Sequence, residues 1–101
     1  MLRYKLQIFM IASFRHKGLR RFFEGDDGSK LPPDMIERIR RILSFLDAAD
    51  RVEDMDQPTF RLHVLKGEMK GFWAVTVRAN WRIVFRFQDG AVEDVDFVDY
   101  P

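Results

Sequence analysis

Cysteine is absent from this 101-residue sequence, and histidine occurs only twice, as His16 and His63. Without thiols the chain forms neither disulfides nor thiolate zinc sites, a composition that suits a reducing cytoplasm. The histidines show no metal-ligand spacing, and Glu93, Asp94 and Asp96 lie on one predicted strand, where neighbouring side chains point to opposite faces. The sequence therefore predicts no metal site and no cofactor.

Long apolar runs and common nucleotide-binding or nucleophile motifs are also absent. No segment approaches the ~20 apolar residues of a membrane-spanning helix. The N-terminal MLRYKLQIFMIASF resembles a signal peptide, but Gln7 interrupts its apolar run and no small-residue cleavage site follows. Neither a P-loop, nor a glycine-rich dinucleotide motif, nor a serine nucleophile elbow occurs. We expect a cytoplasmic protein without membrane contact, and we do not expect acyl transfer.

The residues that are abundant are hydrophobic (47%) and charged (33%), with a net charge of only +1. The charges are segregated along the chain: residues 1–21 hold six basic residues and no acid, and residues 60–86 hold six basic residues and one acid. Acids outnumber bases by ten to five in residues 22–59 and by five to none in residues 87–101. Such blocks predict one electropositive and one electronegative face, unless folding mixes them into an even surface.

Hydrophobic periodicity in the first half of the chain predicts a strand followed by two helices. Residues 10–15 are short and apolar, which is typical of a strand, and residues 17–24 and 32–50 have helical spacing. In the second helix, four apolar residues share one stripe: Ile36, Ile39, Leu43 and Leu46. Residues 1–9 are predicted to be an N-terminal extension, either lengthening the first strand or forming a frayed tail.

After Pro58 the period changes from helical to two, which predicts four strands over residues 60–65, 72–77, 81–87 and 91–98. The Asp-Gly pair before the last strand is a strong hairpin signal. The whole order is β-α-α-β-β-β-β in a single domain over residues 10–101. It predicts an α+β fold, with an antiparallel sheet of about four to five strands and both helices on one face.

The strand over residues 81–87 predicts a basic surface on the other side of the sheet. Trp81 and every second residue after it are apolar, which favours a core role over base stacking for this tryptophan and for Trp73. Arg82 and Arg86 project to the opposite, solvated face. The cations and the histidine that we expect there are Arg82, Arg86, Lys66, His63 and, with less support from the pattern, Arg78.

A basic face of this kind can bind a polyanion, and RNA can also be cleaved on it without a metal. RNA supplies its own nucleophile, the 2′-hydroxyl, so the protein needs a base, an acid and fixed cations for the phosphorane. Arginine suits the last role because its planar fork matches phosphate oxygens. For each residue taken alone, a structural role is the more common one: Arg82 and Arg86 could pair with Asp94 or Asp96, and His63 could be a hydrogen-bonded strand residue. Spacing alone predicts a basic sheet face that binds a polyanion, and it does not extend to predicting an enzyme.

From Met10 to Tyr100 the chain resembles the HigB-type toxins of the RelE/ParE superfamily, the toxin halves of bacterial type II toxin–antitoxin pairs. The stretches that carry the resemblance are SFRHKGLRRFFE, FRLHVLKGEMKGFWAVTVRANWRIVFRF and DFVDY. It implies a small antiparallel sheet flanked by helices, and a ribosome-dependent endoribonuclease that cleaves mRNA through the 2′-hydroxyl. The implied partner is a helix-turn-helix antitoxin, in a hetero-oligomeric complex that binds DNA through the antitoxin.

The resemblance also implies roles for individual residues. The implied catalytic set comes from the LHVLKG and ANWR motifs and from the C-terminal Asp-Tyr, and comprises His63, Lys66, Arg82, Asp99 and Tyr100. Asn80 is implied to contact a base of the codon, while Arg78 and Arg86 are expected to bind RNA from their place on the basic face. Mainly on charge, we expect contacts to ribosomal RNA from Lys17, Arg20 and Arg21.

One departure from the family pattern bears on catalysis. Relatives typically end in Asp-Tyr-His, whereas this chain ends Asp99-Tyr100-Pro101, and proline cannot transfer a proton. Either His63, Lys66 or Asp99 then carries the proton transfers, or the chain cleaves poorly. Two alternatives to an active nuclease follow: a ParE-like toxin that binds DNA gyrase, and an inert module that binds RNA or an antitoxin.

Overall fold

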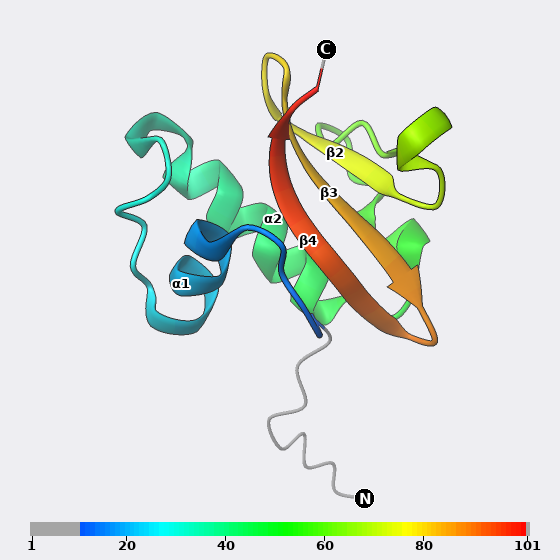
Figure 1. Cartoon of the computed structure of the whole chain (residues 1–101), viewed down its shortest axis with the longest axis horizontal. Helices are drawn as coiled ribbons and strands as arrows, with labels where there is room; N and C mark the ends of the chain where they lie inside the picture. The colour runs from blue at the N-terminus through cyan, green and yellow to red at the C-terminus, as the bar shows by residue number, and fades with distance from the viewer. Residues whose placement is uncertain (1–10, 101) are drawn as a thin grey trace, which may run out of the picture.

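The computed structural model describes residues 11–100, in which two helices lie on one side of a four-stranded sheet (Figure 1). The helices are α1 (Lys17–Gly25) and α2 (Ile36–Ala48), and a 3-10 turn, η1 (Pro33–Met35), leads directly into α2. Proline at the start restricts the backbone and lacks an N–H donor, so the predicted helix over residues 32–50 begins with this tighter turn. The predictions of two helices and of their order are confirmed.

His16 is the N-cap residue that precedes α1, and it has a structural role. Its Nδ1 accepts a hydrogen bond from the backbone N–H of Leu19 at 3.1 Å, and its ring meets the edge of Phe97 at 5.7 Å between centroids. The ring nitrogen thus satisfies one of the backbone donors that the first helical turn leaves without a partner.

We predict that His16→Ala lowers the free energy of unfolding by about 1 kcal/mol, the usual cost of losing an N-cap acceptor. His16→Asn, which retains an acceptor of good capping geometry, should lose less. Urea unfolding of the three proteins measures the difference. Equal losses in both variants would instead assign the effect to packing of the ring on Phe97.

The sheet is antiparallel throughout, in the order β1 (His63–Val64), β2 (Trp73–Arg78), β3 (Trp81–Gln88) and β4 (Ala91–Asp99). The β3–β4 turn has positive φ at both central residues, Asp89 (52°) and Gly90 (80°). This conformation matches the right-handed twist of a hairpin, as the Asp-Gly pair predicts. Two further 3-10 turns, η2 (Val52–Met55) and η3 (Gly67–Met69), interrupt the connections before and after β1.

Two predicted strands are wrong in extent. Residues 11–15 run parallel to β4 but form only isolated bridges, Ile11 with Val92 and Phe14 with Val95. Between these bridges β4 carries a bulge, where Asp94 adopts a left-handed φ of 57°, so continuous pairing is interrupted. Met10, the predicted first residue of this strand, and residues 1–9 lie outside the described residues.

The strand predicted over residues 60–65 is reduced to β1. Arg61 adopts a φ of 54°, which turns the chain out of the extended conformation between Phe60 and His63. The backbone N–H of Thr76 still donates to the carbonyl oxygen of Phe60 at 2.8 Å, so the segment stays attached to β2.

The main core fills the space between the helices and the sheet. Ile39 and Leu46 of α2 and Ile83 and Phe85 of β3 are fully buried in it. The predicted stripe on α2 is confirmed, with Ile42 buried beside it. The two tryptophans pack against this cluster, as the alternation predicts, and Trp81 stacks on Phe97 at 4.7 Å between centroids.

The other side of the sheet, which we call the open face, carries a smaller apolar cluster. Its buried members are Leu65, Phe72, Ala74 and Val84, and Met69, Val98 and Tyr100 pack against them. Residues directly opposite each other in an antiparallel pair project to the same side. The open face therefore contains the rows His63–Ala74–Val84–Asp96 and Thr76–Arg82–Val98.

Candidate active site on the open sheet face

Arg82 is held on the open face by the turn that joins β2 to β3. Its Nη1 donates to the carbonyl oxygen of Ala79 at 2.6 Å and, more weakly, to that of Trp81 at 3.4 Å. Among residues 11–100 it forms no ion pair, and its buried Nε has no hydrogen-bond partner. Carbonyl oxygens, unlike a carboxylate, do not neutralise the charge of the guanidinium group that they hold, and an unpaired buried N–H favours an additional acceptor.

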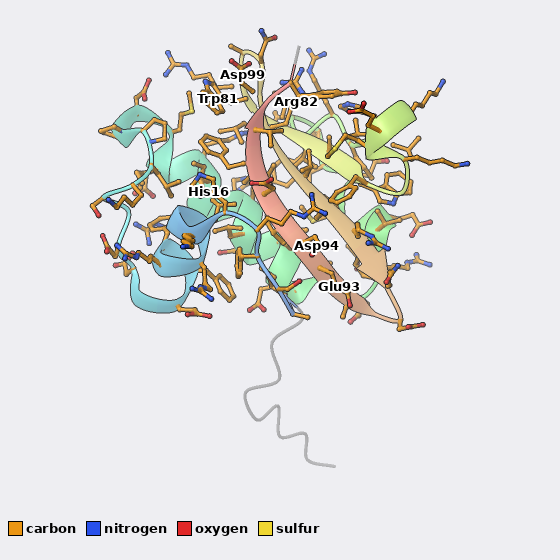
Figure 2. All side chains as sticks on the ribbon, in the orientation of Figure 1. His16, Trp81, Arg82, Glu93, Asp94 and Asp99 are labelled. Carbon is orange, nitrogen blue, oxygen red and sulfur yellow. The ribbon has the colours of Figure 1, made fainter. Side chains whose placement is uncertain are left out.

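The β2–β3 turn and the C-terminal end of β4 are connected by a backbone hydrogen bond. The N–H of Tyr100 donates to the carbonyl oxygen of Asn80 at 2.8 Å, so the C-terminal end of β4 is attached to the β2–β3 turn. Figure 2 shows Arg82 near Trp81 and Asp99 at this end of the sheet, with Glu93 and Asp94 toward the other end. Asn80 and Tyr100 therefore lie close to Arg82, as expected from the motifs.

Asp99 lies on the other side of the sheet. It pairs directly with Trp81, whose ring faces the helices, whereas Arg82 projects to the open face. Tyr100, one residue further, packs against the apolar cluster of the open face. The expected grouping of Asp99 with the basic residues is thus not observed, because the alternation of β4 turns the two C-terminal side chains in opposite directions.

His63 and Lys66 come from the strand and loop on the far side of β2. His63 is exposed, and its Nδ1 lies 2.9 Å from the carbonyl oxygen of Arg61. A carbonyl only accepts, so Nδ1 carries the proton and, in the neutral ring, Nε2 keeps its lone pair. Lys66 is exposed and directly precedes η3.

His63 and Arg82 lie apart from each other on the open face. His63 and Arg82 are two strands and two residues apart, which separates their Cα atoms by about 12 Å. Both side chains project from the same face, over the buried Ala74 and Val84. Two such groups do not touch each other, but they can approach opposite sides of one ribose-phosphate linkage.

Two of the cations expected on the open face, Arg78 and Arg86, form ion pairs with carboxylates. Arg78 pairs with Trp81, so it projects to the helix side of the sheet, where it forms an ion pair with Asp34 of η1. Arg86 does lie on the open face, but it pairs with Asp94 at 3.5 Å. The structural alternative therefore holds for Arg86 and does not hold for Arg82.

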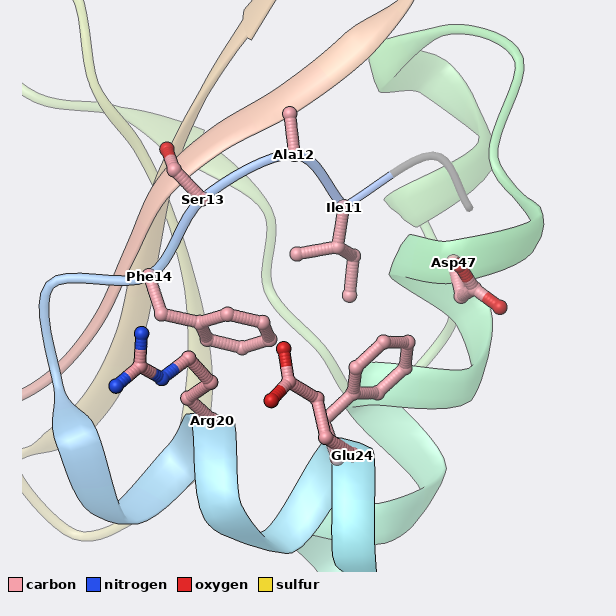
Figure 3. Close-up of a pocket in the computed structure, with 8 residues that line it drawn as sticks. Ile11, Ala12, Ser13, Phe14, Arg20, Glu24 and Asp47 are labelled. Carbon is pink, nitrogen blue, oxygen red and sulfur yellow. The ribbon is translucent and has the colours of Figure 1, made fainter. Parts of the chain in front are cut away.

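The cations of α1 belong to a separate surface. Lys17, Arg20 and Arg21 are exposed on the helix layer, away from the open face. Arg20 lines a pocket of about 650 Å³ between α1, α2 and the segment before α1, together with Phe14, Glu24 and Asp47 (Figure 3). Any contact of these residues with RNA would use this surface and not the candidate active site.

Arg38, a residue that the sequence pattern does not single out, supports the strand beside Arg82. Its guanidinium donates to Thr59 Oγ1 (2.8 Å), to the Thr59 carbonyl (2.7 Å) and to the Thr76 carbonyl (2.9 Å), and stacks over Phe60. Burial lowers the pKa of this guanidinium below its usual range, without removing its charge near neutral pH. Thr76 is the residue opposite Arg82, so Arg38 connects α2 to the site.

Among residues 11–100 no three His, Asp or Glu side chains converge as metal ligands would. No helix in that part of the chain is both long and apolar enough to cross a membrane.

The same arrangement of strands and helices occurs in solved structures of another protein, YoeB. The chain superposes on YoeB in the YoeB–YefM complex from Staphylococcus aureus with a TM-score of 0.57 at 15% identity, covering 90% of this chain and 97% of that one. The YoeB dimer from the same organism gives a TM-score of 0.56 at 14% identity, covering 91% and 98%. At this identity the likeness defines the class of fold.

Sequence similarity then defines the family. Residues 12–101 match the model of the "RelE-like toxin of type II toxin-antitoxin system HigB" family, and the chain belongs to this family. It is 41% identical to Endoribonuclease HigB of Proteus vulgaris over 90% of this chain and 99% of that protein. It is 35% identical to Toxin HigB-1 of Vibrio cholerae, over 80% and 87%. The resemblance drawn from the motifs is confirmed.

Proposed function

We propose that this protein is an mRNA endoribonuclease that acts on the translating ribosome, as the toxin of a type II toxin–antitoxin pair. The observation that carries the proposal is Arg82, a positive group fixed on the open face without a carboxylate partner among residues 11–100. The relative named Endoribonuclease HigB, similar over 99% of its length, supports the same activity.

The proposed reaction is an internal transesterification of the RNA. The 2′-oxygen bonds to the adjacent phosphorus as its proton passes to a base, and the bond from phosphorus to the 5′-oxygen breaks as that oxygen gains a proton. The products are a 2′,3′-cyclic phosphate and a 5′-hydroxyl end. Arg82 would stabilise the negative charge that develops on the phosphorane oxygens.

We assign the proton transfers to His63 on the open face and to Lys66 in the loop that follows β1. His63 presents Nε2 with its lone pair when Nδ1 faces the Arg61 carbonyl, so it is the preferred base. Lys66 is the preferred acid, because Asp99 lies on the opposite side of the sheet from Arg82. Tyr100 would shape the same surface from the end of β4, and Asn80, at the β2–β3 turn, would contact a base of the codon.

The antitoxin and the location of the protein complete the proposal. As a member of a type II toxin family, the chain has an antitoxin partner, which we propose to be a helix-turn-helix protein that carries the DNA-binding function of the complex. Action on ribosomes requires a cytoplasmic location. The family match from residue 12 supports a single toxin domain over residues 10–101, with residues 1–9 as an extension.

The proposal predicts a specific pattern of RNA ends. Purified protein added to ribosomes programmed with a defined mRNA should produce cuts within codons, with 5′-hydroxyl and cyclic-phosphate ends, and should leave the same mRNA intact without ribosomes. Pro101→His should increase the cleavage by restoring a terminal proton donor. Intact mRNA together with inhibited gyrase would support the ParE-like alternative, and no effect on either target would support an inert module.

A further inference from the structure

Arg15, which precedes α1, reaches the open face from beyond the edge of the sheet. Its backbone lies beside β4, since its N–H donates to the carbonyl oxygen of Val95 at 2.8 Å. Its guanidinium carbon nevertheless lies 5.0 Å from the centroid of the Phe72 ring, which belongs to the apolar cluster of the open face. β3 and β4 separate the two backbones, so the side chain of Arg15 extends across the sheet.

The direction of Arg15 follows from contacts of its own segment. Ser13 accepts twice from β4, through its carbonyl from the N–H of Val95 (3.1 Å) and through Oγ from the N–H of Asp94 (2.9 Å). Phe14 packs against the main core on the helix side. The chain bends at Arg15, and the guanidinium of Arg15 lies over Phe72 on the open face.

A second arginine, Arg86, also lies near the ring of Phe72. The guanidinium carbon of Arg86 lies 5.9 Å from the centroid of Phe72, and Asp94 at the bulge pairs with Arg86 at 3.5 Å. Arg15 forms no hydrogen bond or ion pair through its side chain among residues 11–100. Two cations and one carboxylate therefore lie around one aromatic ring, and Arg15 is the cation without a carboxylate.

The remaining acids of the open face limit where an anion can bind. Asp96 lies opposite Val84, with one oxygen accepting the backbone N–H of Phe97 at 2.9 Å, and Glu93 lies opposite Arg86. Both repel a phosphate along β4. A guanidinium against a ring keeps its N–H donors free in its own plane, where phosphate oxygens can accept from two of them.

We propose that Arg15, held over Phe72 and beside Arg86, binds a phosphate of the mRNA that flanks the linkage cleaved at Arg82; this subsite rests on the proposed nuclease function. Arg82 and Arg86 are four residues apart on β3, which places their Cα atoms about 13 Å from each other. Cations at this separation contact different phosphates of one strand. Arg15 thus positions the strand and does not take part in the bond changes.

The test compares Arg15→Ala and Arg15→Lys with a matched control, Arg41→Ala. Arg41 also stacks on a phenylalanine, at 5.2 Å over Phe45, but it lies on α2, away from the open face. Cleavage is measured under single-turnover conditions on ribosomes programmed with a defined mRNA. In Arg15→Ala the toxin concentration for half-maximal rate should rise about tenfold, with little change in the rate at saturation. Arg15→Lys should lose less, and Arg41→Ala should match the wild type.

Uncharged methylphosphonate linkages then locate the contact. Neutralising one phosphate beside the cut should weaken wild-type binding and should not weaken Arg15→Ala further. If each neutral linkage affects both proteins equally, or if Arg15→Ala behaves as the wild type, Arg15 does not bind a phosphate and the nuclease function stands. If the wild type leaves mRNA intact, the nuclease function is wrong, and the subsite that rests on it is wrong as well. Thermal unfolding of the variants excludes loss of the fold.

Discussion

Arg82→Ala is expected to reduce the rate of mRNA cleavage about 10²–10³-fold, the usual effect of removing one preorganised donor from a developing anion. The carbonyl of Ala79 holds the guanidinium at 2.6 Å before any substrate arrives, so no reorganisation is needed at the moment of reaction. Because the interaction forms with the phosphorane, the loss should appear in the rate at saturation and not in the concentration for half-maximal rate.

Two further variants make the Arg82 result specific. Arg82→Lys keeps a charge but not the planar fork, so its rate should fall between those of the wild type and Arg82→Ala. The Arg78→Ala variant changes a residue on the other strand of the same hairpin. It should cleave at close to the wild-type rate, because Arg78 pairs with Asp34 on the helix side. A similar loss in Arg78→Ala and Arg82→Ala would show that general charge, and not the position of Arg82, determines activity.

Arg38→Ala is expected to lower the free energy of unfolding by about 2 kcal/mol, since hydrogen bonds to a charged group each contribute on the order of 1.5–3 kcal/mol and are not additive. Three acceptors on two segments lose their donor at once, the Thr59 side chain and the Thr59 and Thr76 carbonyls. Arg38→Lys should recover only part of the loss, because an ammonium group cannot reach acceptors spread across the guanidinium fork.

The control for the Arg38→Ala variant is a substitution of Arg40, which lies on the same helix. Arg40 pairs with Asp26 at 2.9 Å, and this hydrogen bond raises the pKa of Arg40. Both partners are exposed, and exposed pairs of this kind contribute little to stability, because water and salt screen the two charges. Urea unfolding should therefore show a clearly larger loss for Arg38→Ala than for Arg40→Ala. Equal losses would mean that Arg38 acts through helix propensity alone.

The layers of the fold were predictable because they depend on local periodicity. Alternation along β3 placed Ile83 and Phe85 inside and Arg82 outside, and the structure confirms each of these positions. The helical stripe that contains Ile39 and Leu46 was predictable for the same reason. Steric preferences of the backbone and burial of apolar side chains both act over a few residues, so one sequence window contains the information.

The limits of the strands were not predictable. Arg61 and Asp94 both adopt left-handed backbone conformations that non-glycine residues seldom use. No local pattern indicates them, since each is imposed by contacts with distant segments: Phe60 with Thr76, and Ser13 with Asp94. These two positions shorten β1 and divide the pairing of residues 11–15 with β4.

By itself the sequence determined the family, the layer order and the set of charged residues from which a site could form. Only the tertiary structure decided which charge has which partner: Asp34 pairs with Arg78, Asp94 pairs with Arg86, and Arg82 keeps only carbonyl oxygens. It also brought Arg15 across the sheet to Phe72, 57 positions later in the chain. Electrostatic pairing depends on distances between segments far apart in the chain, and those distances exist only after folding.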